Sequence, residues 1–381
     1  MTEYQKIIPI ANQIVKKYYL CDNCLGRLFS KKLHLSSNKL LGKKLKKNLN
    51  SSQTCYVCKN LFEHLDTYLK LMYDVSSAYS YSSFSVGAMI KPSIIDRDDY
   101  IRSKYKLKGI DSIKTDITKE LGKSFSKKSK KSIDHQDPEI TFTLNLKDEL
   151  CQLRSKSVTF SGRYVKNQRG LAQKQKPCDN CSGKGCRICN FHGISEFDSV
   201  EGLISKFLFE KFGGTIAKFT WIGGEDKSSL VLGTGRPFFV KIQNPLKRNL
   251  RLNRAKLDSL EINNLKITTE SPKKPVKFIS SIEAKISTEF TIDAENLKKL
   301  KDLTKQPIVV YDKSGKRLEK KVFSVRYKKN TNNSFILKIK AEGGLPIKRF
   351  VTGDDVSTGL SQILNTQCMC QEFDFLDIEV Q

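Results

Sequence analysis

Four Cys-x-x-Cys pairs restrict what this chain can fold into more than any other feature of its sequence. They lie at residues 21 and 24, 55 and 58, 178 and 181, and 186 and 189, and they hold eight of the 11 cysteines. Two thiolates at this spacing chelate one Zn²⁺, and two such pairs complete a tetrahedral site. The chain is therefore expected to fold around one or two bound metal ions.

The pairs group into two clusters. The first joins CDNC at residue 21 to CYVC at residue 55 across a long basic stretch. The second is compact, because Ser-Gly-Lys-Gly separates its pairs and the glycines allow the tight turn that one ion requires. Neither cluster offers a His, a carboxylate or an open position, which indicates structural zinc. The predicted ligands are Cys21, Cys24, Cys55, Cys58, Cys178, Cys181, Cys186 and Cys189.

Other states of these cysteines stay open at this point. The first four could be reduced thiols without a ligand, and the second four could form a redox dithiol, although no thioredoxin-like βαβ pattern surrounds them. Met1–Leu20 has the pattern of an amphipathic helix, without the apolar core and cleavage site of a secretory signal. No apolar run is long enough to cross a bilayer. We therefore expect a cytoplasmic protein in a reducing compartment, where paired cysteines indicate metal more often than disulfide.

The balance of charge predicts a polyanionic partner. The chain has 381 residues, enough for two or three domains, with a formal net charge of +28. Hydrophobic residues make up 38% and charged residues 28%, which is typical of a globular protein. Nucleic acid is the favoured partner, a generally solvated basic surface is the alternative, and a membrane surface is a weaker one.

The carboxy-terminal half shows an α+β pattern. A helix is predicted to start after Asp198 or Ser199 and to end at Gly213–Gly214. Strand-like runs follow, among them KFTWI, SLVLG, PFFVKI and SFILKIKA, and they indicate a mixed or antiparallel sheet. Upstream, the composition of Lys123–Ser132 (KSFSKKSKKS) indicates a flexible loop that could touch phosphates.

The densest candidate chemistry lies between Phe219 and Arg248. Gly-Gly-Glu-Asp follows a predicted strand and presents Asp226 on a turn, and Gly233–Pro237 then predicts a second tight turn that carries Arg236. An aspartate and an arginine on glycine-shaped loops suit an RNA-facing active site. By residue type alone, a plain hairpin with an exposed Glu-Asp remains the alternative.

These segments resemble the archaeal and eukaryotic tRNA pseudouridine synthase family numbered ten. In that family a GRED-type turn carries the catalytic aspartate and a run like LGxGRPF follows it; here Gly223-Gly-Glu-Asp226 precedes LGTGRPF. CDNCLGR and CYVCKNLF are similar to the family's amino-terminal zinc knuckles. SGRYVKNQRG and the second cysteine cluster are similar to its connector, and GGLPIKRF is similar to its third catalytic motif.

The resemblance implies an α+β fold in four parts. They are a zinc-knuckle segment (1–60), a THUMP-type RNA-binding domain (61–170), a connector with the second cysteine cluster (171–195) and a pseudouridine synthase domain (196–381). In the last part, helices would flank a mixed or antiparallel sheet.

The resemblance also implies the chemistry. The enzyme would flip a uridine out of folded tRNA, and Asp226 would act on its glycosidic bond as nucleophile or base. Lys348 is the expected catalytic cation beside that carboxylate. The isomerisation needs no organic cofactor, and the target would be uridine 54, 55 or both in the TΨC arm. The residues expected to bind the substrate are Arg236, Phe278, Ile279, Pro346 and Ile347.

Basic clusters are expected to follow the phosphates of the tRNA elbow. They lie at Lys247–Arg254, Lys273–Lys277, Lys316–Lys321 and Arg326–Lys329. Aromatic residues such as Tyr164 and Trp221 could stack on bases, although each is more often a core residue. No obligate protein partner and no membrane contact is evident from the sequence.

Three positions depart from the family pattern. Gly224 stands where an arginine is usual, Lys277-Phe278-Ile279 lacks the tyrosine of a Lys-x-Tyr motif, and Pro346 replaces the tyrosine of the third motif. A zinc-containing tRNA-binding or chaperone protein that has lost the chemistry is therefore the main alternative. A thiol-dependent RNA enzyme that uses residues 178–189 ranks below it, because no nucleotide-binding loop is visible.

Overall fold

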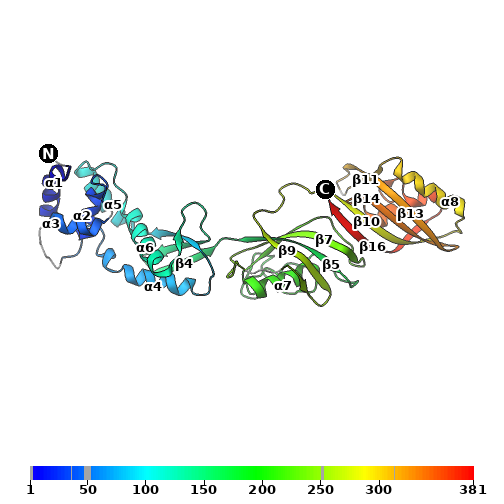
Figure 1. Ribbon diagram of the computed structural model, residues 1–381, viewed down its shortest axis with the longest axis horizontal. Helices are drawn as coiled ribbons and strands as arrows, with labels where there is room; N and C mark the ends of the chain where they lie inside the picture. Colours follow the sequence, from blue (N-terminus) through cyan, green and yellow to red (C-terminus); the bar gives the residue numbers. More distant parts are fainter. Residues whose placement is uncertain (1–2, 36, 47–52, 250–252, 313) are drawn as a thin grey trace. The chain divides into compact units, whose positions relative to one another are not determined.

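The computed structural model describes residues 3–35, 37–46, 53–249, 253–312 and 314–381 (Figure 1). The chain divides into two compact units, Met1–Lys156 and Ser157–Gln381. Each unit has its own buried cluster of apolar side chains, as expected of a chain of this length. In the part of the chain that the structure describes, no helix has the length and apolar character needed to span a membrane.

The first unit combines a helical amino-terminal part with a four-stranded sheet. Its elements are α1 (Glu3–Lys17), α2 (Asp22–Ser30), α3 (Asn38–Lys46), η1 (Leu61–Glu63), α4 (Leu65–Ser76), β1 (Ser83–Met89), α5 (Pro92–Lys104), α6 (Ile113–Ser129), β2 (Ser132–Ile133), β3 (Ile140–Asn145) and β4 (Leu150–Ser155). The strand order is β2-β1-β3-β4, with β1 parallel to both neighbours and β3 antiparallel to β4. Helix α6 packs on β1 and α4 packs on β4 (Figure 1).

Three buried aromatic rings join helix and sheet in this unit. Phe84 of β1, Phe125 of α6 and Phe142 of β3 lie with ring centroids 5.0–5.9 Å apart in edge-to-face arrangements. This geometry is favourable because the positive ring edge meets the negative ring face. Phe125 also shows why the loop expected at Lys123–Ser132 is wrong: α6 continues to Ser129, since Leu121 and Phe125 are both fully buried one helical turn apart.

A buried ion pair ties the first cysteine segment to the helices that follow it. The Arg27 guanidinium of α2 donates to the Asp98 carboxylate of α5, and both side chains are at most 2% exposed. Arg27 also donates to the carbonyl of Asp111, and Asp98 accepts the backbone N–H of Ile113 at the start of α6. Three helices therefore meet at one buried charge pair. Loss of Asp98 would leave the buried Arg27 guanidinium without a carboxylate, and loss of Arg27 would leave Asp98 only its contact with Arg102 Nε at 3.3 Å.

The second unit is dominated by one large sheet. Its elements are β5 (Val158–Lys166), α7 (Val200–Phe212), β6 (Ala217–Trp221), β7 (Val231–Ile242), β8 (Ala255–Lys256), β9 (Leu260–Thr268), β10 (Phe278–Thr288), α8 (Ala294–Lys298), η2 (Lys299–Thr304), β11 (Ile308–Tyr311), β12 (Arg317–Lys320), β13 (Val322–Thr331), β14 (Ser334–Glu342), α9 (Ile347–Thr352), β15 (Val356–Ser357), α10 (Leu360–Leu364) and β16 (Cys368–Val380). The order is β13-β14-β10-β16-β7-β5-β9-β8, with β6 also paired to β7, and β12-β11-β15 form a small second sheet.

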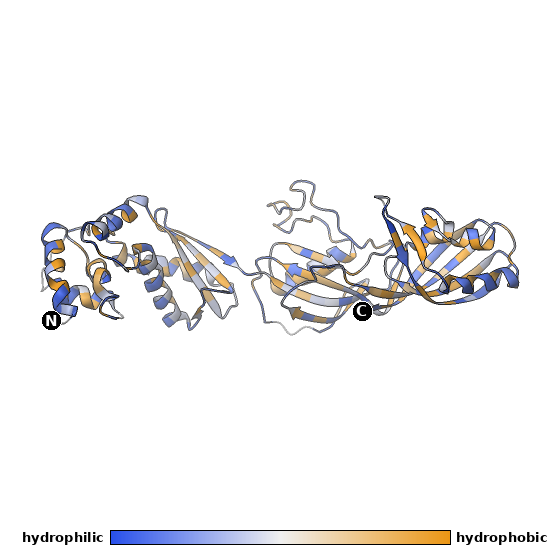
Figure 2. Ribbon diagram, turned by 90° about the horizontal axis from the view of Figure 1, so that it is seen from above, coloured by the Kyte–Doolittle hydropathy of each residue, from blue (hydrophilic) through white to orange (hydrophobic). Residues whose placement is uncertain are grey.

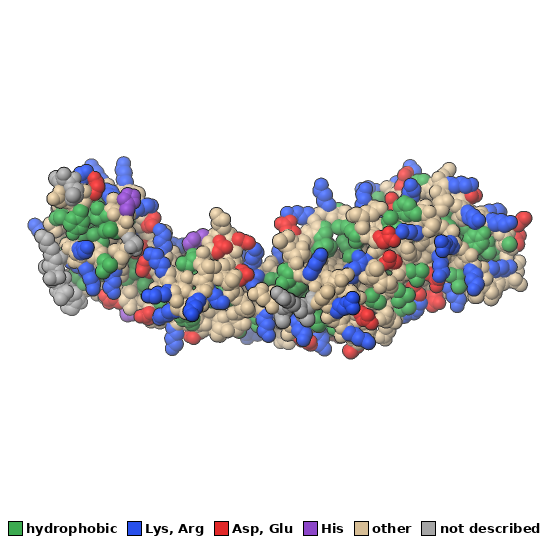
Figure 3. Space-filling view, viewed as in Figure 1, with side chains coloured by type: hydrophobic (Ala, Val, Ile, Leu, Met, Phe, Trp, Pro, Cys, Tyr) green, Lys and Arg blue, Asp and Glu red, His purple; other side chains and the backbone are tan. Residues whose placement is uncertain are grey.

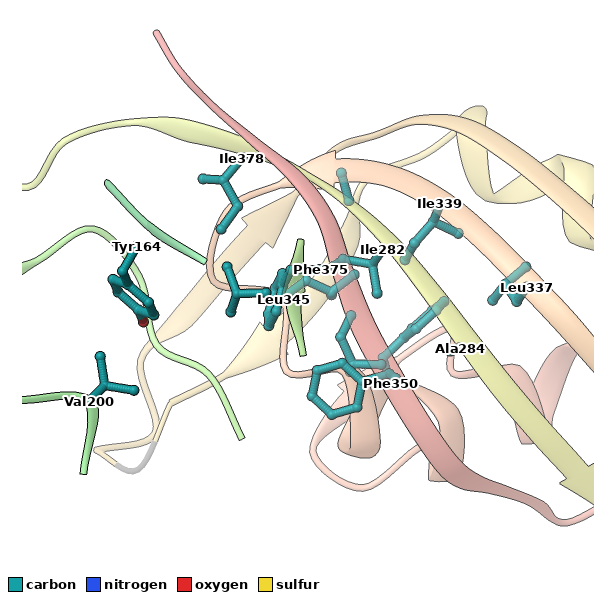
Figure 4. Packing of buried hydrophobic residues seen from close by; sticks show 14 of the residues in the cluster. Tyr164, Val200, Ile282, Ala284, Leu337, Ile339, Leu345, Phe350, Phe375 and Ile378 are labelled. Atoms are coloured by element: carbon teal, nitrogen blue, oxygen red, sulfur yellow. The ribbon is translucent and has the colours of Figure 1, made fainter. Parts of the chain in front are cut away.

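Two antiparallel halves meet in the middle of the large sheet. On one side β13, β14, β10 and β16 are antiparallel neighbours, and on the other side β7 pairs antiparallel with β5 and β6. The halves join where β16 runs parallel to β7, at the single register pair Phe375–Val231. Apolar and polar residues alternate along the strands (Figure 2), and the apolar residues Ile282, Phe350 and Phe375 belong to one buried cluster at the junction (Figure 4).

The predicted elements of this unit are partly confirmed. Helix α7 begins after Ser199, whose hydroxyl accepts the Gly202 N–H, and it ends at Gly213 as expected. The second tight turn predicted at Gly233–Pro237 is instead the kinked start of β7, where Gly233 and Gly235 have φ of 59° and 80°. Glycine alone adopts this backbone without penalty, so the strand bends there without reversing.

The first strand of the second unit differs from the predicted division at residue 170. β5 was assigned to the segment 61–170, but it lies between β7 and β9 in the large sheet. Alternation of apolar residues identifies a strand without identifying its sheet, because the pairing partners lie far along the chain.

The buried ion pair yields a prediction about stability. Replacing Arg27 or Asp98 singly with alanine should lower the free energy of unfolding of the first unit by about 3–5 kcal/mol, because the remaining charge stays buried. The double variant Arg27→Met with Asp98→Leu should cost less than the sum of the two single changes. Urea unfolding followed by far-UV circular dichroism measures this effect.

The only tryptophan, Trp221, provides the internal control, because it lies in the second unit. Its fluorescence transition should stay at the wild-type urea concentration in all three variants. Single variants as stable as the wild type would show that the pair does not connect the helices energetically.

Candidate active site and metal centres

The turn that carries Asp226 lies beside the junction of the two half-sheets. It connects β6 to β7 and ends just before Val231, the residue of β7 that pairs with β16. The neighbouring α9 begins at Ile347 and packs on β16. The turn and the GGLPIKRF segment, which are more than 100 residues apart in sequence, therefore reach the same region of the sheet.

Asp226 and Lys348 are in direct contact. The Lys348 ammonium lies 3.0 Å from Asp226 Oδ2, and the side chains are 52% and 33% exposed. Asp226 Oδ1 accepts hydrogen bonds from the backbone N–H and the hydroxyl of Ser228, at 2.9 and 2.6 Å. Partial burial raises the pKa of Asp226, but the Ser228 hydrogen bonds and the Lys348 charge outweigh it and lower the pKa to about 2. The carboxylate is thus ionised at neutral pH and remains open to solvent.

A buried charge cluster, formed by Glu225, Lys166 and Arg236, contacts the turn that carries Asp226. The Glu225 side chain is 0% exposed; its Oε1 lies 3.2 Å from Lys166 Nζ and its Oε2 lies 3.2 Å from Arg236 Nε. The Tyr164 hydroxyl donates to Glu225 Oε2 at 2.8 Å. Lys166 also donates to the Asp226 carbonyl at 3.1 Å. Buried groups therefore hold both the Glu225 side chain and the Asp226 carbonyl, which restricts the position of the Asp226 side chain.

Arg236 and Tyr164 belong to this buried cluster and do not face the solvent. Both are 0% exposed, and Arg236 also donates to the Ile222 carbonyl at 3.0 Å. The Arg236 guanidinium lies over the Phe375 ring, 4.4 Å from its centroid. From the sequence, both residues were candidates for contact with the substrate. The structure buries them instead, because both contact the buried Glu225 carboxylate. Trp221 is half-buried and stacks on Phe219 at 4.8 Å.

A second arginine fastens the far side of the turn to β16. Arg169 makes two parallel hydrogen bonds of 2.7 Å to the Asp374 carboxylate and donates to the Ser228 carbonyl at 2.6 Å. Asp374 also accepts the Leu230 N–H. Bidentate arginine–carboxylate contacts fix direction as well as distance. Arg169 therefore connects the turn to the strand on the other side of the sheet junction.

The remaining predicted residues line the same region from two segments. Phe278 begins β10, and its backbone carbonyl accepts the Gly343 N–H at 2.7 Å. Its ring is half-buried between Gly223 and Gly343: a β-carbon at either glycine would come within 2.4 Å of it. Only glycine leaves room for the ring, so the two loops close on Phe278. Ile279 is the next residue of β10 and pairs with Glu342 and Glu379.

The segment before Lys348 is anchored in the core. Ile347 is 4% exposed and belongs to the buried cluster of the second unit, while Pro346 precedes α9 and is half-buried. This anchoring positions Lys348 at the start of the helix. Gly224, which stands at the usual arginine position, is exposed and has no close neighbour.

Lys166, Arg169, Glu225 and Asp374 were not identified from the sequence. SGRYVKNQRG had been recognised as a family segment, but nothing in it shows that Lys166 and Arg169 contact a turn 60 residues later. The signal that could have identified Lys166 is its place at the end of the alternating pattern of β5, because a lysine on the buried face of a strand requires a partner.

The first four cysteines form a buried group. Cys21 Sγ and Cys58 Sγ are 3.6 Å apart, and all four sulfurs lie within 4.8 Å of one another. Tetrahedral zinc with bonds of about 2.3 Å places sulfurs about 3.8 Å apart. Neighbouring sulfurs and burial together raise the pKa of Cys24 well above its usual value, because four thiolates in one small volume repel. A bound cation removes that repulsion.

The second four cysteines form a similar but more exposed group. Cys189 Sγ lies 3.7 and 3.8 Å from the sulfurs of Cys186 and Cys181. Backbone N–H groups of Gly185 and Gly193 donate to Cys181 and Cys189 at 3.2 and 3.3 Å, as in metal-binding knuckles. Both groups of cysteines can therefore hold a metal ion, and hydrogen bonds to the sulfurs support that role.

A polar cavity of about 330 Å³ lies in the first unit. It is bounded by α2, α3 and α6, and its lining includes Arg27, Asn38 and three lysines. Asp116 in this lining is 4% exposed, and burial raises its pKa to about 6. None of the predicted catalytic residues contributes to it.

Comparison of the sequence with known proteins identifies the family of the chain. Residues 160–379 match the family model "Pus10, C-terminal", and residues 68–145 match "Pus10 THUMP domain, archaeal". A protein of Nitrosopumilus maritimus named tRNA pseudouridine synthase Pus10 is 72% identical over 100% of both chains. A protein of the same name in Cenarchaeum symbiosum is 35% identical over 96% of this chain and 90% of its own.

The chain belongs to the Pus10 family of pseudouridine synthases. The family, the α+β fold with a THUMP domain and the isomerase class expected from the sequence are thereby confirmed. A solved structure titled "Crystal Structure of a Cbf5-Nop10-Gar1 Complex" is also similar, with 11% identity over 57% of this chain and 48% of that chain, but a TM-score of 0.32 is too low to support an argument.

The pKa of Asp226 tests the contact with Lys348. Carbon-13 NMR of labelled aspartate should show an Asp226 pKa of about 2. Lys348→Met should raise this pKa toward the ordinary 3.8, because the ammonium group that stabilises the carboxylate is removed. Since the folded pKa is the lower one, ionised Asp226 stabilises the fold above pH 3.8, and this contribution is lost as the pH falls toward 2.

Lys340→Met is the matched control, because Lys340 pairs with Glu379 in the same unit. Asp226→Asn identifies the resonance. An Asp226 pKa that does not change in Lys348→Met would mean that the two side chains are not in contact in solution.

Proposed function

We propose that this chain isomerises uridine 54, uridine 55 or both in the TΨC arm of tRNA, with Asp226 as the catalytic nucleophile. The observation that carries the proposal is the geometry of Asp226: an ionised, solvent-open carboxylate that Lys348 contacts and a buried charge cluster positions. Relatives named tRNA pseudouridine synthase Pus10 support tRNA as the substrate.

The reaction is an isomerisation, so atoms and electrons balance without a co-substrate. The N1–C1′ bond of the uridine breaks, the uracil turns, a C5–C1′ bond forms, and the C5 proton is replaced by one at N1. As the nucleophile, Asp226 donates an electron pair to the sugar or to the base while the N1–C1′ bond breaks, and it leaves again when the C5–C1′ bond forms. Lys348 stabilises the negative charge of the Asp226 carboxylate when Asp226 leaves. Because Ser228 holds Oδ1 with two hydrogen bonds, Oδ2 is the oxygen proposed to react.

The target uridine must leave the RNA stack to reach Asp226. The Phe278 ring, which lies between Gly223 and Gly343, is the aromatic group proposed to pack on that base. Ile347 and Pro346 anchor the segment that carries Lys348, and Ile279 extends the strand that carries Phe278. We assign Arg236 to positioning the turn, because it is buried against Glu225.

Exposed basic residues offer contacts for the phosphates of a folded tRNA. Lys and Arg side chains are distributed over both units among fewer acidic ones (Figure 3). Residues of the predicted clusters at Lys273–Lys277 and Arg326–Lys329 are largely exposed. In the cluster at Lys247–Arg254, Lys247 and Arg254 are exposed and Arg248 is buried, and residues 250–252 lie outside the described residues. Binding should therefore weaken strongly as salt rises.

Two structural zinc ions complete the proposal. Sulfur separations of 3.6–3.8 Å in both groups of cysteines match tetrahedral zinc, and neither group includes a His or carboxylate for an open catalytic position.

We propose four functional segments: the zinc-knuckle segment (1–60), the THUMP-type domain, the connector (171–195) and the catalytic domain. A cytoplasmic location stays a prediction.

Pseudouridine mapping tests the proposed activity. Wild-type protein incubated with unmodified tRNA transcript should produce a carbodiimide-dependent primer-extension stop in the TΨC loop, and Asp226→Ala should abolish it. Asp302→Ala is the matched control, since Asp302 is an exposed aspartate paired with Lys305 in the same unit. Tight tRNA binding without any stop by the wild type would replace this proposal with the binding-protein alternative.

Arg169 should act on the rate and not on substrate affinity. Arg169→Ala releases the turn from Asp374, so kcat should fall by about 10- to 100-fold with KM nearly unchanged, because a displaced nucleophile loses orientation. Arg317→Ala, at an exposed arginine paired with Glu319, should leave both constants unchanged. A change confined to KM would assign Arg169 to tRNA binding.

Metal analysis tests the two zinc sites separately. Freshly purified protein should contain two zinc ions per chain by plasma mass spectrometry. Cys24→Ser should remove the ion of the first group and Cys181→Ser that of the second, because three thiolates bind zinc less tightly than four. Fewer than one ion in the wild type would contradict structural zinc, and Cys151→Ser, outside both groups, serves as control.

A further inference from the structure

Two exposed apolar side chains project from the second cysteine group. Ile188 is 73% exposed and Phe191 is 51% exposed. They lie on either side of Cys189, so the sulfur group holds both of them. Loops that a rigid support holds in place are common sites of binding.

The backbone around Phe191 is the unusual feature of this loop. Two residues with left-handed backbone follow the second cysteine in three of the four Cys-x-x-Cys pairs. Their φ angles are Lys59 50° and Asn60 65°, Ser182 48° and Gly183 83°, and Asn190 48° and Phe191 62°. Asparagine and glycine, which tolerate this conformation, occupy the second position in two pairs, whereas an aromatic residue occupies it in the third. The backbone does not favour a ring there, which indicates that the ring itself has a use.

The loop is firmly attached to the second unit. The His192 ring stacks on Phe209 of α7, with centroids 4.0 Å apart and planes 14° apart. His192 Nδ1 lies 3.0 Å from the Thr215 carbonyl, and the Cys178 N–H donates to the Gly193 carbonyl at 2.8 Å. Phe191 is therefore presented from a fixed base that is shared with the catalytic residues.

The charges around the loop favour a polyanion. Lys174, Lys176, Lys184 and Arg187 are exposed, and Asp179 is the acidic residue between positions 174 and 193. An exposed aromatic ring beside basic side chains is the arrangement that binds unpaired nucleotides, because the ring stacks on a base while the cations contact its phosphates.

We propose that Phe191, with exposed Ile188 and Arg187 in the same loop, is a stacking site for an unpaired base of the tRNA substrate. The proposal rests on the proposed tRNA-modifying function and adds a contact outside the Asp226 region. Every base has a stacking face, so the site tolerates different bases at this position. Its contribution is to hold the RNA in register on the catalytic unit.

Affinity measurements on the full chain test this site. Phe191→Ala should raise the Kd for unmodified tRNA by about tenfold in a filter-binding assay at fixed salt, and Phe191→Trp should keep wild-type affinity. Phe191→Gly should weaken binding equally, although glycine suits the backbone and retains the metal. Phe290→Ala is the matched control, at a phenylalanine 64% exposed elsewhere in the same unit. Zinc content is measured in every variant.

Cross-linking gives an independent readout. tRNA that carries 4-thiouridine at unpaired positions should cross-link, under near-ultraviolet light, to the peptide that contains Phe191. Wild-type affinity in both Phe191→Ala and Phe191→Gly, or affinity lost only together with zinc, would overturn the stacking site while leaving the proposed function intact. Self-association that Phe191→Ala abolishes, without a cross-link, would instead assign the surface to protein. Absence of tRNA binding by the wild type would overturn both proposals.

Discussion

The charge cluster around Glu225 is the interaction on which the site depends. A carboxylate with 0% exposure is costly unless cations neutralise it, and here Lys166 and Arg236 approach its two oxygens while Tyr164 donates to one of them. These partners come from β5 and β7, neighbours in the large sheet. Because the paired strands fix the partners of Glu225, they also fix the position of the next residue, Asp226.

The sheet junction explains why distant segments converge on one carboxylate. β16 and β7 meet at a single register pair, so the ends of their connecting loops are free to approach each other. Arg169 bridges this gap through Asp374, and α9 brings Lys348 from the other half-sheet. Phe278 fits between the two glycine loops because neither carries a side chain there. The Asp226 carboxylate is therefore partly exposed, while Glu225, Lys166 and Arg236 next to it are buried.

Local patterns predicted much of this molecule. The cysteine spacing predicted both sulfur groups, the cap at Ser199 and the stop at Gly213 predicted α7, and the motif resemblance predicted the contact between Asp226 and Lys348. Predictions failed where pairing between distant segments decides the outcome. Gly233 and Gly235 indicate a turn by residue type, yet hydrogen bonding to β5 keeps the chain in one strand. The Lys/Ser composition of the end of α6 likewise concealed the buried Phe125.

The buried cluster was beyond the reach of the sequence for the same reason. Lys166 looks like one more basic residue in a chain of formal net charge +28, and Arg236 was assigned to the substrate; only the folded sheet shows that both side chains are buried against Glu225. A strongly basic composition conceals the few cations that are structural. Burial separates them from those available to RNA, because a fully buried guanidinium cannot contact a phosphate.

The most direct test is the single-turnover rate of a variant that removes the cluster's charges without removing Asp226. Lys166→Met and Arg236→Met combined with Glu225→Gln replace the two buried ion pairs by neutral groups of similar size, so that no buried charge is left without its partner. With tRNA affinity and zinc content unchanged, the rate of pseudouridine formation at saturating enzyme should fall by about 100-fold, because Asp226, the proposed nucleophile, loses its fixed position. A rate equal to that of the wild type would contradict the claim that buried charges position Asp226.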